Sequence, residues 1–139
     1  MTIQERQEEI VDEFSMYGDW MEKYEYIISL GKELPLIDLE KKVDENLING
    51  CQSRVWLAAD LEDGKIHFTA DSDAIITKGI ISLMIRVFTN SEPKEIINSD
   101  LFFVDEIGLK EHLSPTRSNG LVSMIKQIKM YAIALQAKV

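Results

Sequence analysis

The sequence predicts an α+β domain in which a small antiparallel sheet packs against helices. Apolar residues recur at helical spacing towards both ends of the chain. Between residues 53 and 70 they instead alternate with polar residues, as in half-buried strands. With 139 residues, the default is one compact core, so we expect residues 1–139 to form a single domain.

The first two helices have recognisable beginnings. Thr2 starts a capping-box sequence and a helix that reaches about residue 16, and Asp19 caps a second helix that reaches about residue 30. Gly31 is expected to end the second helix. Because the connection is short, the two helices are expected to form an antiparallel hairpin.

The middle of the chain changes from helical to strand periodicity. A helical turn is expected at residues 38–42, and a short strand at 46–48. Alternation then predicts a strand over 53–59, a turn at 62–65 and a second strand over 66–70.

The rest of the chain is predicted to be helical. Ser72 or Asp73 is expected to cap a central helix that carries few polar residues. Helical segments are predicted at residues 72–88, shortly after residue 91, within 101–113, and over 114–137.

Charge and hydropathy exclude several classes of protein. The chain carries 24 acidic and 15 basic residues, a formal net charge of -9, which argues against nucleic-acid binding and suits a basic protein partner. Charged residues interrupt the longest apolar stretches, so no membrane span is expected. The acidic N-terminus lacks the pattern of a signal peptide, and we expect a cytoplasmic protein.

Cys51 is the outstanding candidate for covalent chemistry. A single cysteine excludes an internal disulfide, and two histidines leave little room for a histidine-rich metal site, so no metal is expected. Cys51 is predicted on a loop at a strand end, with Arg54 as the nearest cation in sequence and Lys78 and Arg117 as more distant ones. Such cations lower a thiol pKa, whereas the alternative is a small buried hydrophobic residue.

The histidines fit poorly as catalytic partners of the thiol. His67 has the alternation of a solvent-facing strand position, and His112 lies beside a helix start, where a structural role is more common. Without a base or a second thiol, Cys51 is left with chemistry in which it attacks, holds a group and hands it on. The residues therefore favour a carrier.

Three separated blocks of sequence resemble the SufE family of sulfur-acceptor proteins. Gly-Cys-Gln-Ser-Arg-Val-Trp at residues 50–56 resembles the family's active-cysteine segment. Residues 71–79 are similar to its second block, and residues 112–121 to its third. Tyr-Gly-Asp-Trp at 17–20 also resembles the family's N-terminal helix pair.

The resemblance implies a partner and a reaction. A cysteine desulfurase, which carries the pyridoxal phosphate, would pass persulfide sulfur to Cys51 and be stimulated in doing so. Cys51 would then deliver sulfur to the iron–sulfur cluster assembly scaffold. The implied fold is similar to that of the scaffold proteins themselves, but a lone cysteine cannot supply the several thiolates that a cluster needs. A monomer or a homodimer is compatible with the resemblance.

The resemblance also implies that Cys51 is largely buried in the free protein and that its loop swings out for transfer. Trp56, Leu113 and the central helix are the expected shelter, although each is equally well explained as core. Asp73 is expected either to restrain the loop or to act as an ordinary N-cap. Arg117 is expected to face an anionic partner, and the supporting residues are Gly50, Gln52, Ser53, Arg54, Asp73 and Arg117.

Two other functions remain open from the residues alone. A binding module could regulate a desulfurase through conformation without any chemistry at Cys51. A peroxide-sensing thiol would require an accessible and fast-reacting Cys51, which a sheltered loop disfavours.

Overall fold

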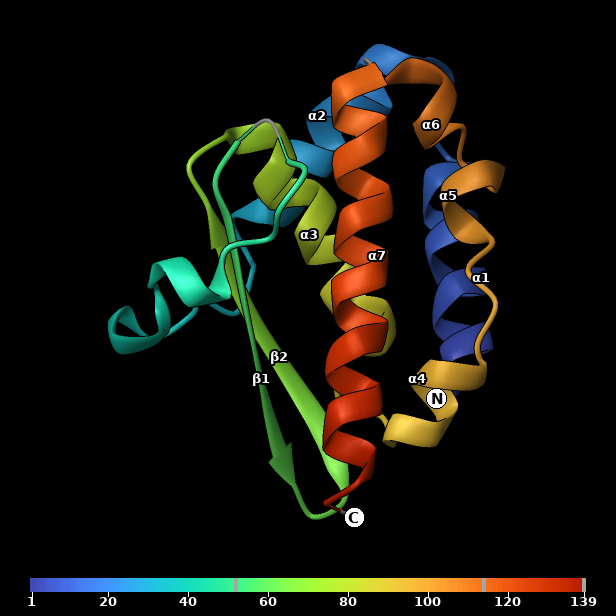
Figure 1. The fold of residues 1–139 in the computed structure, drawn as a ribbon. Helices are drawn as coiled ribbons and strands as arrows, with labels where there is room; N and C mark the ends of the chain where they lie inside the picture. The colour runs from blue at the N-terminus through green and yellow to red at the C-terminus, as the bar shows by residue number, and fades with distance from the viewer. Residues whose placement is uncertain (52, 114, 139) are drawn as a thin grey trace.

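A hairpin of two strands and a set of helices form the α+β architecture that the sequence predicts (Figure 1). The structure is a computed structural model that describes residues 1–51, 53–113 and 115–138, with the side chains of 115–117 outside that description. Within these residues the sheet consists of β1 (Val55–Glu62) and β2 (Lys65–Ser72), paired antiparallel.

The hairpin turn follows from its two central residues. Asp63 and Gly64 have φ angles of 52° and 80°, the left-handed conformation of a two-residue turn that matches strand twist. Both strands extend further towards this turn than the sequence indicated, to the pair Glu62 and Lys65. One face of the hairpin is buried, as the alternation predicted, through Val55, Leu57, Ile66, Phe68 and Ala70.

The segment before the hairpin projects from the sheet and contains two 3₁₀ turns, η1 (Leu39–Lys41) and η2 (Asp44–Asn46) (Figure 1). The turn expected at 38–42 is thereby confirmed. The strand expected at 46–48 is wrong. η2 takes up Asn46, the first residue of that expected strand, and in the described chain a single bridge, between Leu47 and Trp56, remains at the edge of β1.

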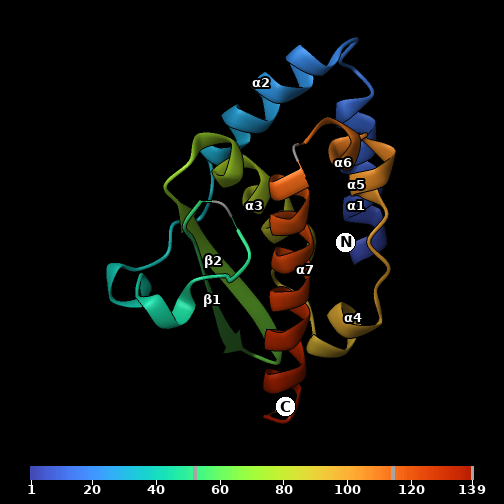
Figure 2. The same ribbon diagram turned by 45° about the horizontal axis from the view of Figure 1, so that its top comes forward.

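The N-terminal helices begin where their caps predicted. In α1 (Ile3–Phe14) both bonds of the capping box are present, and in α2 (Trp20–Gly31) the Asp19 carboxylate accepts from Glu22 N–H. The expected antiparallel hairpin is wrong, because α2 diverges from α1 and packs mainly on α3 (Ile75–Phe88) (Figure 2).

Gly31 is the last residue of α2, so the helix ends where predicted, but in right-handed geometry with Lys32 as its C-cap. Gly31 also has a second role, in packing. A Cβ at Gly31 would lie 2.9 Å from the backbone nitrogen of Gly79 in α3, and a Cβ at Gly79 would lie 2.1 Å from the Ile27 carbonyl oxygen. The two glycines therefore permit the close crossing of α2 and α3.

α3 is the central element of the core. Its predicted apolar stripe is buried, and the helix packs on β2, α1 and the long C-terminal helix α7 (Pro115–Gln136). The stripe consists of Ile76, Ile80, Leu83, Met84 and Val87. The predicted cap is wrong, since the N-cap residue is Ala74, whose side chain cannot cap; the Ser72 hydroxyl instead accepts from Ala74 N–H at 3.3 Å, before the helix begins.

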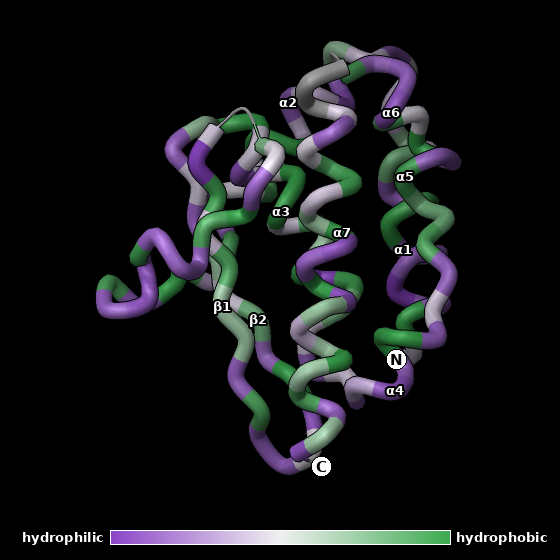
Figure 3. Tube along the Cα trace, viewed as in Figure 1, coloured by the Kyte–Doolittle hydropathy of each residue, from purple (hydrophilic) through white to green (hydrophobic). Residues whose placement is uncertain are grey.

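The remaining short helices connect α3 to α7. They are α4 (Pro93–Asn98), α5 (Phe103–Glu106) and α6 (Leu109–His112), in agreement with the helical turns expected there. α4 packs against α7, which runs alongside the hairpin (Figure 1). The tube of α3 is coloured mostly as hydrophobic, whereas the turn at the end of the hairpin is mostly hydrophilic (Figure 3). No helix among the described residues has the length and apolar character needed to cross a membrane.

Candidate functional site

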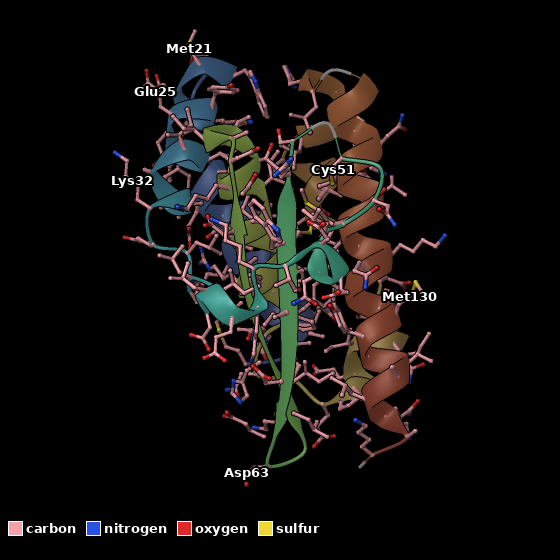
Figure 4. The ribbon with its side chains drawn as sticks, turned by 60° about the vertical axis from the view of Figure 1, so that its left-hand side comes forward. Met21, Glu25, Lys32, Cys51, Asp63 and Met130 are labelled. Carbon is pink, nitrogen blue, oxygen red and sulfur yellow. The ribbon has the colours of Figure 1, made fainter. Side chains whose placement is uncertain are left out.

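Cys51 lies on the loop that enters β1, at the end of the hairpin remote from the Asp63 turn and beside α7 (Figure 4). The loop is closed at its base by a hydrogen bond of 2.8 Å from Ile48 N–H to the Val55 carbonyl. Gly50, directly before the cysteine, has a φ of 90°, a conformation that favours glycine. The prediction that Cys51 occupies a loop at a strand end is confirmed.

The loop rests on α7 through small residues. The Cys51 thiol donates a weak hydrogen bond to the Gly120 carbonyl, with an S···O distance of 3.7 Å. A Cβ at Gly120 would lie only 3.4 Å from Cys51 Sγ. In the next turn, Ser123 Oγ would lie 2.6 Å from a Cβ placed on Gly50.

The thiol is part-buried rather than fully enclosed, and burial raises its pKa. Of the cations that could lower this pKa, Arg117 has its side chain outside the described residues. The Arg54 residue is exposed, and Lys78 forms an ion pair with Asp71 at 3.5 Å. With its pKa raised, the resting thiol is mostly protonated at neutral pH and holds less of the reactive thiolate than an exposed cysteine would.

Asp73 fastens the exit of the cysteine loop. Its carboxylate accepts from Arg54 N–H at 3.0 Å, and its own N–H donates to the Arg54 carbonyl at 3.2 Å. The Ser72 hydroxyl also donates to that carbonyl, at 2.9 Å. The interpretation of Asp73 as an N-cap is wrong, because its side chain is engaged with the loop one residue beyond the last strand pair.

Of the parts expected to cover Cys51, the structure shows contact with the cysteine loop for α3. Ser53 Oγ lies 3.4 Å from Thr77 Oγ1, so α3 does contact the loop. Trp56 instead pairs with Leu47, and the Lys42 ammonium lies 4.6 Å from its ring centroid. Leu113 is part-buried against the hydrophobic core.

Gly120 and Ser123 were missed as site residues by sequence reasoning. Gly120 had two signals: it lies in the third matched block, and glycine inside a helix is unfavourable by about 1 kcal/mol relative to alanine, which calls for a packing reason. Ser123 had none. Two predicted supporting residues cannot be placed, since Gln52 and the Arg117 side chain lie outside the described residues.

The two histidines do not approach the thiol as catalytic bases would. The His112 ring stacks on Trp20 with a centroid distance of 4.2 Å, and its Nδ1 lies 2.8 Å from the Gly108 carbonyl. His67 lies on β2 and approaches Glu62 at 3.6 Å. In the described part of the chain, no three His, Cys, Asp or Glu side chains gather as ligands for a metal ion.

Comparison with known proteins adds independent findings. Residues 8–132 match the SufE family, described as an Fe-S metabolism associated domain. An uncharacterised SufE-like protein of Rhizobium meliloti is 39% identical over 90% of this chain and 93% of its own length. One of Rhizobium etli is 40% identical over 88% of this chain and 86% of its own.

A solved structure supports the fold. The solution structure of a hypothetical protein from Thermus thermophilus matches with a TM-score of 0.78 over 96% of this chain and 97% of that one, at 16% identity. At that identity the likeness concerns the fold alone. From the family match and the two relatives, we conclude that this chain belongs to the SufE family of Fe-S metabolism associated domains.

Proposed function

We propose that Cys51 accepts sulfur from the persulfide of a cysteine desulfurase and carries it to the iron–sulfur cluster assembly scaffold, and that the chain stimulates the desulfurase by removing this sulfur. The observation that carries the proposal is the position of the sequence's single cysteine. It lies part-buried on a loop that begins with a positive-φ glycine and is fastened at its exit by Asp73. Family membership adds the setting of Fe-S metabolism.

The reaction needs only thiol chemistry at Cys51. The thiol first gives its proton to solvent, and the thiolate attacks the terminal sulfur of the donor persulfide. An S–S bond forms at Cys51 while the S–S bond in the donor breaks. The donor cysteine leaves as a thiolate and takes up a proton, so the exchange needs neither an oxidant nor a reductant.

The resting geometry suits a carrier that reacts only when docked. Because burial raises the pKa of the Cys51 thiol, the free protein holds little thiolate at neutral pH. Lifting the loop from Gly120 would expose the sulfur to solvent, remove the main cause of the raised pKa and increase the thiolate fraction. The partner's docking energy is therefore expected to activate the thiol.

Sulfur transfer can be tested by mass spectrometry. The chain is incubated with a cysteine desulfurase, pyridoxal phosphate and cysteine, and the intact mass is recorded before and after treatment with a reductant. We expect one added sulfur atom on the wild-type chain, lost on reduction, and none on Cys51→Ser. An adduct that persists on Cys51→Ser, or none on the wild type, contradicts the proposal.

The second candidate function is a binding module that regulates the desulfurase by conformation alone. The raised pKa of Cys51 favours it, because a protonated thiol is a poor nucleophile. The two functions differ in the behaviour of Cys51→Ser. A carrier loses stimulation of the desulfurase while retaining binding, whereas a binding module retains both.

A further inference from the structure

The surface of α7 that faces the cysteine loop presents two small residues one turn apart. Gly120 lies under Cys51, and Ser123 faces Gly50. Residues three positions apart lie on one face of a helix, so the two contacts form one continuous surface. We call Gly120 and Ser123 the α7 seat.

We propose that the α7 seat positions the cysteine loop, and that side-chain size at Gly120 and Ser123 determines how often the Cys51 thiol is available for reaction. Its biological role rests on the proposed sulfur-acceptor function. The claim about access to the Cys51 thiol does not depend on that function, and any reagent that reacts with the thiol can test it.

The interactions at the seat are weaker than those at the ends of the loop. At the seat, the Cys51 thiol makes one weak hydrogen bond, and the Ser123 hydroxyl donates within its own helix, to the Asn119 carbonyl at 3.1 Å. The loop ends are fixed by backbone hydrogen bonds at Ile48 and Arg54. Gly50 and Cys51 can therefore leave α7 while Ile48 and Arg54 stay in place.

The contact distances predict which side chains at Gly120 and Ser123 fit beneath the cysteine loop and which displace it. A methyl group at Gly120 would meet Cys51 Sγ at 3.4 Å, an ordinary van der Waals distance, so alanine fits with the loop seated. A leucine there would occupy the space of the thiol itself. A leucine at Ser123 would likewise take up space that the loop occupies, because Ser123 Oγ would already lie 2.6 Å from a Cβ on Gly50.

The first test compares alkylation rates of Cys51 by iodoacetamide across pH in Gly120→Ala, Gly120→Leu and Ser123→Leu. Ala134→Leu, at an exposed position of the same helix, is the matched control. We expect Gly120→Leu and Ser123→Leu to speed alkylation at pH 7 and to lower the inflection of the pH profile. Each unit of lowered pKa raises the thiolate fraction at pH 7 about tenfold and the rate by less, because a thiolate of lower pKa is a weaker nucleophile. Gly120→Ala and the control should behave like the wild type.

A second test keeps the proposal falsifiable if a leucine variant fails to fold. Gly50→Ala places a methyl 2.6 Å from Ser123 Oγ, whereas in Gly50→Ala with Ser123→Ala the nearest remaining Ser123 atom is Cβ, at 3.6 Å. The positive-φ strain at Gly50 is the same in both variants. We expect alkylation to be faster in Gly50→Ala and to fall back towards the wild-type rate in the double variant, with Ser123→Ala alone near wild type.

The outcomes separate this proposal from the sulfur-acceptor function. Three results would overturn the proposed role of the α7 seat and leave the sulfur-transfer proposal untouched. The first is a wild-type alkylation rate in Gly120→Leu and Ser123→Leu, and the second is the same rate in Gly120→Ala and Gly120→Leu. The third is strict additivity of the effects of Gly50→Ala and Ser123→Ala. If the wild type never accepts sulfur from a desulfurase, the proposed function fails while the alkylation results still decide the seat.

Discussion

At the scale of single residues, Cys51 shows how burial regulates a nucleophile that has no dedicated base in the described site. The thiol is the reactive group of the proposed carrier, yet its surroundings favour the neutral form. A protonated, part-buried sulfur is protected from oxidants and small thiols between encounters. Reactivity then depends on displacement of the loop rather than on a permanently ionised sulfur.

The raised pKa of Cys51 predicts the pH dependence of its alkylation. In the native chain the rate should rise with pH to an inflection above the ordinary thiol value of about 8.5, and in urea the inflection should return to about 8.5. By linkage, the thiol's contribution to stability is fully present below about pH 8.5 and is lost as pH rises towards the native pKa. A native inflection at or below 8.5 would contradict this account.

Asp73 is expected to act on the loop through its acceptor oxygen. Asp73→Ala removes the partner of Arg54 N–H, which should lower the free energy of unfolding by about 1 kcal/mol and speed alkylation of Cys51. Asp73→Asn retains a side-chain oxygen and should restore most of both properties. Urea unfolding and alkylation measure them, and equal behaviour of the alanine and asparagine variants would refute the role of the hydrogen bond.

At the scale of secondary-structure elements, the crossing of α2 and α3 depends on two glycines in contact. Gly79→Ala would bring a Cβ to 2.1 Å from the Ile27 carbonyl oxygen, so the helices would have to separate. We expect a loss of about 2–3 kcal/mol in the free energy of unfolding, measured in urea. Gly18→Ala is the control, because a Cβ there meets nothing within 4 Å, and it should change stability by less than about 0.5 kcal/mol.

The sequence predicted most elements because their signals are local. The caps at Thr2 and Asp19 and the turn at Asp63 and Gly64 depend on neighbouring residues, and all are found in the structure. The close approach of Gly31 to Gly79 depends on a partner in α3 far along the chain, so the local signal, which gave the helix end correctly, did not reveal it.

The candidate site was predicted in part for the same reason. Cys51 could be singled out because it is the single cysteine and because its flanking residues resemble the family segment. Its contact with Gly120 joins residues 69 positions apart, which no local pattern reveals. The sequence left Asp73 with two roles, loop restraint or N-cap, because the hydrogen bonds to Arg54 that decide between them become visible only when the hairpin register is known.

At the scale of the whole molecule, one partly buried ionic cluster ties three helices together. Arg86 in α3 donates to Glu9 and Glu13 in α1, and Tyr26 in α2 donates to Glu13. The hydrogen bond from Arg86 is the main cause of the lowered pKa of Glu13. The pKa of Tyr26 is raised to about 12, mainly by burial and next by its hydrogen bond to Glu13.

The cluster predicts how stability depends on acid. Glu13 has a lowered native pKa, so its contribution to stability is present above the unfolded value of about 4.3 and is lost as pH falls through the native pKa. Arg86→Gln should be less stable at pH 7 and should lose less on acidification than the wild type. Urea midpoints between pH 7 and pH 3 measure both effects.

Lys32→Gln is the matched control for Arg86→Gln, because it removes one positive charge from an exposed side chain at the end of α2 (Figure 4). It should retain the wild-type stability at pH 7 and the wild-type acid response. If Arg86→Gln and the wild type lose stability in parallel on acidification, the cluster does not cause the acid dependence.

The central claim concerns the movement of one sulfur atom to Cys51, and a single-turnover transfer measures it most directly. A cysteine desulfurase is loaded with persulfide, freed of cysteine and mixed with this chain, and the sulfur on both proteins is followed by peptide mass spectrometry. The account predicts that the desulfurase loses its sulfur as the Cys51 peptide gains it, one atom for one. Sulfur that stays on the desulfurase, or leaves it without appearing at Cys51, would contradict the account.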